Sequence, residues 1–100
     1  MIYHVTKKSD WEMALQVGSY EAASLKTEGF IHNSTAAQVA GVLDRYYKNE
    51  KDLVLLHIDE SKLYSSLKYE LAPSVNELFP HIFGPINIDA VIKTEEIKNA

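Results

Sequence analysis

The longest unbroken apolar run in the chain is Leu53-Val54-Leu55-Leu56, and it continues through His57 and Ile58 to Asp59. A strand that faces water on one side alternates apolar and polar residues, whereas an unbroken run is typical of a strand covered on both faces. The run is too short to cross a bilayer. We therefore predict that residues 53–59 form the central strand of a sheet, with the other elements arranged around it.

Three other stretches predict strands. Residues 2–6 (Ile-Tyr-His-Val-Thr) are rich in β-branched and aromatic side chains, and the period of two places Ile2, His4 and Thr6 on one face. Residues 67–71 alternate like a half-buried strand, and residues 88–93 form the last strand. The segment 72–85 contains Pro73, Pro80, Gly84 and Pro85, so we expect it to be the largest irregular segment.

Helix signals occur at two places. Residues 9–12 (Ser-Asp-Trp-Glu) fit a capping box, so a helix is expected from Ser9 to Gly18. Residues 35–38 (Thr-Ala-Ala-Gln) fit a second one, which opens a helix over 36–48 that ends at a left-handed Asn49. The residues of this second helix that are expected to face the core are Ala36, Val39, Ala40, Leu43, Tyr46 and Tyr47.

These elements, with a short strand at Tyr20, one helical turn over 21–26 and a turn over 61–63, predict an α+β fold. We expect a single domain over 1–100, with a small mixed or antiparallel two-sheet core and two main helices. The polar residues 95–100 are expected to be a frayed or weakly helical tail.

The composition excludes several classes of function. The net charge is −4 and Arg45 is the one arginine, so no nucleic-acid partner is expected. The chain has no cysteine, which rules out disulfides, a thiol nucleophile and thiolate zinc sites. Neither a signal peptide nor a membrane-spanning run is recognisable, so we expect a cytoplasmic protein without membrane contact.

The stretch from Gly29 to Thr35 carries the first candidate site. A short apolar strand over 30–32 holds His32, and the hydroxyls of Ser34 and Thr35 follow at the start of a helix. Strand ends beside helix N-termini often hold ligands, because backbone amides and side chains converge there. The same hydroxyls also serve as helix caps, and both interpretations stay open.

The four histidines, His4, His32, His57 and His81, are too widely spaced for a local metal motif. His57 and Asp59 share a strand face, but a single histidine on a strand is more often a hydrogen-bonded structural residue. We therefore predict no metal site. Elemental analysis for zinc or nickel tests the remaining idea of a metal hydrolase.

The segment from Asn76 to Pro85 is the second candidate. It is too apolar to be left in water, which makes it either a plug for one end of the core or an anchored loop that presents Glu77 and His81 in a cleft. Its exposed aromatic residues, together with Tyr46 and Tyr47, would favour a peptide- or protein-binding module instead.

The order of motifs resembles the bacterial family catalogued as domain of unknown function 952 over nearly the whole chain. In that family Cys often stands where this chain has Asn33, which argues against thiol chemistry there. The motifs are Ile-Tyr-His at 2–4, Trp11 with Ala14, Ser24-Leu25, Glu-Gly-Phe-Ile-His-x-Ser-Thr at 28–35, Leu-Val-Leu-Leu at 53–56, Tyr69-Glu70, and Glu-Leu-Phe-Pro-His-Ile-Phe-Gly-Pro at 77–85.

The family in turn resembles the ADP-ribosyltransferase-like fold, which implies a cleft for NAD or an ADP-ribose-like ligand and no covalently bound cofactor. The resemblance implies that Glu77 is the catalytic carboxylate, that His4 binds the ligand, and that the strand leading into Ser34 and Thr35 lines the cleft. From their positions at a strand end and in the segment 76–85, we expect His32 to be catalytic as well and His81 to bind the ligand together with Ser34 and Thr35. A fixed carboxylate near the ribose would stabilise an oxocarbenium-like state when the nicotinamide–ribose bond breaks. The extra histidines resemble the RNA 2′-phosphotransferase branch of the fold, so an enzyme of this family would be a glycosyl or phosphoryl transferase.

Overall fold

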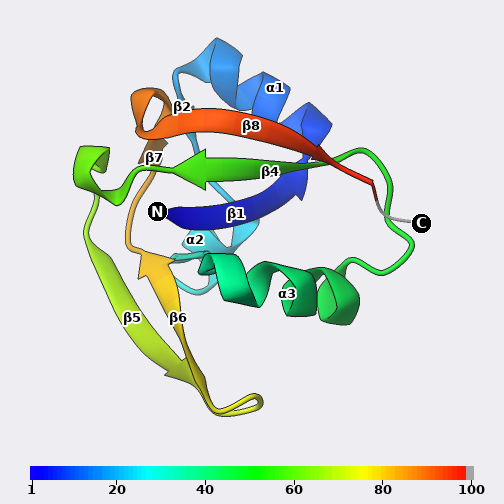
Figure 1. Ribbon diagram of the computed structural model, residues 1–100. Helices are drawn as coiled ribbons and strands as arrows, with labels where there is room; N and C mark the ends of the chain where they lie inside the picture. The colour runs from blue at the N-terminus through cyan, green and yellow to red at the C-terminus, as the bar shows by residue number, and fades with distance from the viewer. Residues whose placement is uncertain (99–100) are drawn as a thin grey trace.

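The computed structural model describes residues 1–98 and has an α+β fold built on antiparallel sheets (Figure 1). The predicted α+β class is therefore confirmed. The elements are β1 (Ile2–Lys7), α1 (Lys8–Val17), β2 (Ser19–Tyr20), α2 (Ala23–Thr27), β3 (Ile31–His32), a 3₁₀ turn (Ala36–Gln38), α3 (Val39–Tyr46), β4 (Leu53–Ile58), a 3₁₀ turn (Glu60–Lys62), β5 (Leu67–Ala72), β6 (Glu77–Ile82), β7 (Ile86–Asn87), a 3₁₀ turn (Ile88–Ala90) and β8 (Val91–Ile97).

β4 is the central strand of a three-stranded sheet in the order β1-β4-β8, as the apolar run predicted. The predicted face of β1 also forms, because Ile2, His4 and Thr6 are all buried. Apolar side chains from this sheet, α1 and the smaller sheets make one core, in which each large buried residue contributes about 2 kcal/mol of hydrophobic stabilisation. The core consists of Ile2, Trp11, Ala14, Tyr20, Ile31, Val54, Leu56, Ile58, Ile82, Ile86 and Ala90.

The second sheet has the order β3-β6-β5 and includes a hairpin that projects from the body (Figure 1). The expectation of an irregular segment over 72–85 was wrong, because β6 occupies its middle and pairs with β5 from Ala72↔Glu77 to Leu67↔Ile82. Pro80 lies inside this central strand, where prolines are normally excluded. It is tolerated because β3 ends at His32, one position before the residue that would accept a hydrogen bond from the N–H that Pro80 lacks.

A third, two-stranded sheet pairs β2 with β7, which the two-sheet expectation did not include. The capping box expected at Ser9 does not form either. α1 starts one residue earlier, at Lys8, with no side-chain cap, and the carbonyl of Asp52 accepts from the Lys8 amide at 2.8 Å instead. The predicted helix end is confirmed, since Gly18 has the left-handed φ of 98°.

The helix expected over 36–48 is shorter and less buried than predicted. It begins with the 3₁₀ turn, where the predicted capping box of Thr35 and Gln38 is present and Gln38 Oε1 accepts from the Thr35 amide at 3.0 Å. α3 then ends at Tyr46, and Asn49 is left-handed with a φ of 66°, as expected. Of the residues expected to face the core, Val39, Leu43 and Tyr47 are half-buried, whereas Ala36, Ala40 and Tyr46 are exposed.

The chain's last strand lies later than predicted. Residues 88–90 form a 3₁₀ turn, and β8 runs from Val91 to Ile97, so Glu95, Glu96 and Ile97 pair with β4 rather than fraying. The polar sequence misled the prediction because β8 is an edge strand, where charged side chains are common. Residues 99 and 100 of the expected tail lie outside the described part. No helix within residues 1–98 is long and apolar enough to span a bilayer.

Candidate functional site

His32 and His81 lie opposite each other on β3 and β6, with ring centroids 5.3 Å apart. The Asn33 amide donates to the Pro80 carbonyl at 3.0 Å, which makes the next pair, His32 and His81, a non-hydrogen-bonded one. Side chains of such pairs approach each other most closely in an antiparallel sheet. Two of the histidines singled out in the sequence are thus brought together by strand register.

Two phenylalanines complete this group. The Phe30 ring stacks on His81 at a centroid distance of 4.0 Å and an interplanar angle of 17°, and it meets His32 edge-on at 4.9 Å. Phe83 lies 5.5 Å from Phe30. We call Phe30, His32, His81 and Phe83 the histidine–phenylalanine cluster. His81 is 8% exposed, whereas the His32 side chain is 54% exposed, so the cluster reaches from the body of the protein to solvent.

Each histidine of the cluster is paired with a carboxylate. Glu70 Oε1 lies 2.8 Å from His81 Nδ1, and Glu28 Oε2 lies 3.0 Å from His32 Nε2. A carboxylate on one ring nitrogen fixes the tautomer, so the Nδ1–H of neutral His81 donates to Glu70 and its Nε2 carries the lone pair. That Nε2 has no hydrogen-bond partner among the described residues. Such a nitrogen is able to accept a proton from a bound molecule.

Lys68 brings a positive charge to the same face. It pairs with His81 across β5 and β6, which places both side chains on one side of the sheet. Its Nζ lies 5.5 Å from the centroid of the Phe83 ring. A row from His32 through His81 to Lys68 therefore runs across the three strands.

His4 lies beneath this row and is fully engaged. Its Nδ1–H donates to the His32 carbonyl at 2.6 Å, its Nε2 lies 2.8 Å from the Tyr20 hydroxyl, and that hydroxyl lies 3.0 Å from Thr6 Oγ1. Burial lowers the pKa of His4 to about 4 and raises the pKa of Tyr20 to about 12, so both are neutral at pH 7. His4 thus ties β1 to the backbone of His32.

The other predicted site residues lie outside the cluster. Ser34 is buried, and its backbone exchanges two hydrogen bonds with Tyr3, at 2.8 and 2.7 Å. Thr35 is the N-cap of the 3₁₀ turn. Glu77 is exposed at the start of β6, where Gln38 Nε2 donates to its Oε1 at 3.2 Å. It lies four positions before His81 along β6, which is a separation of about 13 Å.

The structure therefore does not place Glu77 beside His32. The carboxylates near the two histidines are Glu28 and Glu70, which sequence reasoning did not select, and Phe30 and Lys68 were also not selected. Glu28, Phe30 and Glu70 all stand within the family motifs, so the signal was present in the sequence. Only the strand register shows that Glu70 and His81 meet.

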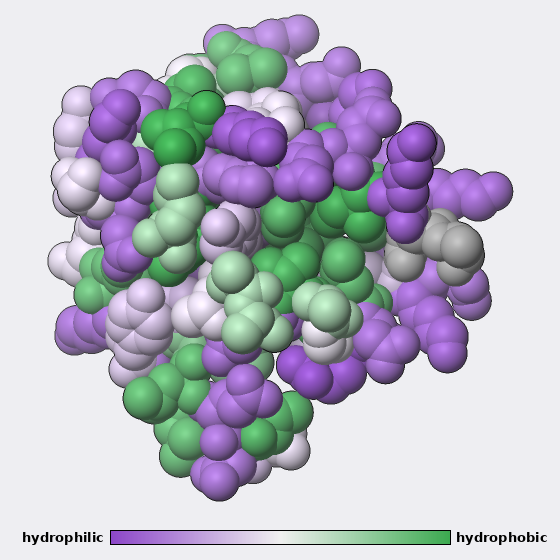
Figure 2. All heavy atoms as spheres, viewed as in Figure 1, coloured by the Kyte–Doolittle hydropathy of each residue, from purple (hydrophilic) through white to green (hydrophobic). Residues whose placement is uncertain are grey.

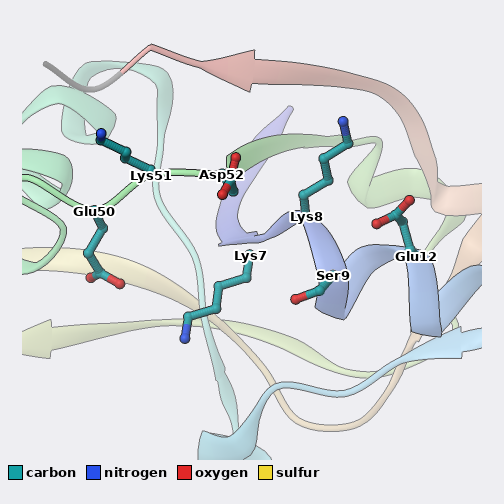
Figure 3. A pocket seen from close by; sticks show the side chains of 7 residues that line it. All are labelled: Lys7, Lys8, Ser9, Glu12, Glu50, Lys51 and Asp52. Carbon is teal, nitrogen blue, oxygen red and sulfur yellow. The ribbon is translucent and has the colours of Figure 1, made fainter.

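Two surface depressions lie elsewhere. One, of about 500 Å³, lies at the start of α1, where Figure 3 shows three lysines interleaved with acidic side chains. The second, of about 550 Å³, lies between α1 and the start of α2, and Tyr20 is part of its lining. The first is lined by Lys7, Lys8, Ser9, Glu12, Glu50, Lys51 and Asp52.

The fourth histidine is separate from the cluster. His57 Nε2 lies 2.9 Å from Glu95 Oε1, and its ring meets Tyr3 edge-on at 4.9 Å. Within residues 1–98, no group of three or more histidine and carboxylate side chains is arranged to hold a metal ion. One buried side-chain atom in this part of the chain, Asn33 Oδ1, has no hydrogen-bond partner.

Comparisons with known proteins place the chain in a family. It is 26% identical to CC0527 from Caulobacter crescentus, a structural genomics target, over 97% of this chain. The TM-score is 0.88 against the crystal structure, of which 85% is covered, and 0.83 against the solution NMR structure, of which 84% is covered. No protein of curated function shows significant similarity to it. The model of the family described as "Protein of unknown function (DUF952)" matches residues 5–94, and the chain belongs to that family.

Proposed function

We propose that this protein binds a nucleotide-type ligand, NAD or an ADP-ribose-like compound, at the histidine–phenylalanine cluster. The observation that carries the proposal is the pairing of His32 with His81 beneath the Phe30 ring. Aromatic planes of this kind stack on heterocycles, and the neighbouring Lys68 supplies charge for a phosphate.

We propose that the fold is used as in ADP-ribosyltransferase-like proteins, with revised roles for the residues. His81, oriented by Glu70, takes or gives a proton, and His32 contacts the ligand from the exposed end of the cluster. Glu70 replaces Glu77 as the carboxylate nearest the reacting centre. His4 positions His32 through its carbonyl rather than contacting the ligand, since both its ring nitrogens are occupied.

The test is a titration followed by NMR. With NAD, ADP-ribose and AMP at millimolar concentration, we expect shifts of the Phe30, His32 and His81 ring signals. Glu70→Gln should weaken binding about tenfold, because a charged hydrogen bond to His81 is lost. His57→Gln, which removes a histidine outside the cluster, is the matched control and should bind as the wild type does.

Absence of shifts in the cluster with all three compounds would disprove the proposal. Turnover is tested separately, by chromatographic detection of nicotinamide released from NAD. Binding without release would make the protein a binding module for the nucleotide, whereas release that is lost in Glu70→Gln and kept in Glu77→Gln would support the revised roles.

A peptide- or protein-binding module is the second candidate. It is favoured by the exposure of Leu78 (55%) and Phe83 (38%) within the segment 77–85. Aromatic anchors of this kind dominate peptide interfaces. Shifts at Phe83 on addition of an apolar peptide, together with none for the nucleotides, would favour this candidate.

A further inference from the structure

The outer edge of β5 is an open pairing surface. β5 is the end strand of its sheet, and the Ser66 carbonyl accepts from the Phe83 amide at 2.8 Å on the β6 side. The direction of backbone groups alternates along an antiparallel strand. The N–H and C=O groups of Leu67, Tyr69 and Leu71 therefore face away from β6, and no strand within residues 1–98 lies beside them.

The side chains of this edge are unusually apolar for an exposed strand. Tyr69 is 47% exposed, Leu71 is 54% exposed, and Leu78, which lies opposite Leu71, is 55% exposed. Figure 2 shows hydrophobic side chains beside hydrophilic ones on the lobe that projects from the body. By the strand register, Tyr69, Leu71 and Leu78 lie on the same face of the sheet as the buried pair Ile31 and Ile82 and extend that face beyond the core.

Another edge strand, β8, is protected against such pairing. It carries the exposed charged side chains Lys93, Glu95 and Glu96, and its pairing with β4 contains a bulge between His57 and Ile58. Charges and bulges are devices that prevent edge-to-edge pairing. Within the described residues, β5 has six regular positions, no bulge and no proline.

The sequence of β5 is complementary to itself. We propose that β5 pairs antiparallel with β5 of a second copy of this chain, about a twofold axis through Tyr69. In that register Lys68 of each copy lies opposite Glu70 of the other, and Leu67 lies opposite Leu71. The outward backbone of Tyr69 makes the central pair a hydrogen-bonded one. Centring the axis on Lys68 or on Glu70 would instead place like charges together and would present the wrong backbone side.

The pairing joins two β3-β6-β5 sheets into one of six strands and places the exposed Tyr69 and Leu71 beside Tyr69 and Leu67 of the second copy. It also brings Lys68 of the second copy to Glu70, the carboxylate that orients His81. The effect of Lys68 on the site rests on the proposed function, but the proposal of a dimer does not. A nucleotide titration without shifts would therefore leave the proposal of a dimer intact.

The test uses two charge variants and their mixture. Sedimentation of the full chain, whose monomer mass is 11.3 kDa, should give twice that mass at several hundred micromolar and the monomer mass on dilution. Lys68→Glu places two carboxylates opposite each other at both ends of the axis, and Glu70→Lys does the same with two ammonium groups. Each variant alone should dimerise about tenfold more weakly or worse, since like charges directly opposite are unfavourable.

An equimolar mixture of the two variants should recover the dimer, because each then meets the opposite charge. A variant that failed to fold would not recover in the mixture, so rescue separates pairing from stability. Lys93→Glu, on the protected edge, is the control and should dimerise as the wild type does. A wild type that stays monomeric at these concentrations, or folded charge variants that do not recover on mixing, would overturn the proposal.

Discussion

Replacing His4 by glutamine should remove a large part of the acid sensitivity of this fold. Burial of the ring lowers the pKa of His4 from 6.5 to about 4, although the hydrogen bond to the His32 carbonyl acts in the opposite direction. In the unfolded chain the same ring titrates at its ordinary value. Between these two values the unfolded chain binds one more proton than the folded one, so the free energy of unfolding falls as the pH falls.

The size of the effect follows from the shift. The difference between the folded and unfolded pKa values of His4 lowers the free energy of unfolding by about 3 kcal/mol when the solution is acidified through both values. About 2 kcal/mol of this loss falls between pH 7.5 and pH 5. The contribution is fully present above the unfolded value of 6.5 and is gone below about 4. For a domain of this size, 2 kcal/mol is a large share of the total stability.

The assay is urea unfolding followed by circular dichroism at pH 7.5, 6.5, 5.5 and 5. His4→Gln should be less stable than the wild type at pH 7.5, where it loses hydrogen bonds, but its stability should fall less steeply toward pH 5. His57→Gln is the control, because it removes a histidine on the same sheet without touching the buried network. Parallel profiles for His4→Gln and the wild type, or an NMR titration midpoint of His4 near 6.5, would refute the reasoning.

Three other predictions concern stability, and each is checked by urea unfolding at pH 7.5. Gly18→Ala should lower the free energy of unfolding by about 1 kcal/mol, because a residue with a Cβ is strained at a φ of 98°. Gly41→Ala inside α3 should instead raise it by up to about 1 kcal/mol if the flexible Arg45 side chain moves aside. Equal effects of the two substitutions would contradict the argument from backbone conformation. Tyr20→Phe should cost about 1–3 kcal/mol, since it leaves His4 Nε2 without its donor, and an unchanged midpoint would show that water replaces the hydroxyl. Ile82→Ala should lower the free energy of unfolding by about 2–5 kcal/mol, because Ile82 is fully buried, and Met13→Ala should lower it by less than about 0.5 kcal/mol, because Met13 is 60% exposed. Similar values for the two substitutions would place Ile82 outside the core.

Several features of the fold follow from local sequence. The apolar run of β4 predicts a strand covered on both faces, and the period of two along β1 places Ile2, His4 and Thr6 inside, as observed. Gly18 ends α1 as expected, and Asn49 has the expected left-handed φ although α3 already ends at Tyr46, because left-handed backbone is a property of single residue types. These signals need no knowledge of distant neighbours.

Other features depended on the tertiary structure. Pro80 indicates a break by itself, yet it lies inside β6, because β3 stops where its missing N–H would be needed. The first amide of α1 is capped by the distant Asp52 rather than by Ser9, which local spacing favoured.

The candidate site divides in the same way. The sequence by itself determined that His32 lies in a short apolar strand and that His81 lies in the apolar segment 76–85, since both follow from residue type and spacing. Only the pairing of β3, β6 and β5 decided that these two histidines meet and that Glu70 rather than Glu77 accompanies them. The bridge between Tyr3 and Ser34, which joins β1 to the end of β3, brings His4 to the carbonyl of His32. Strand register sets such neighbours, and register is fixed by the whole core rather than by any one segment.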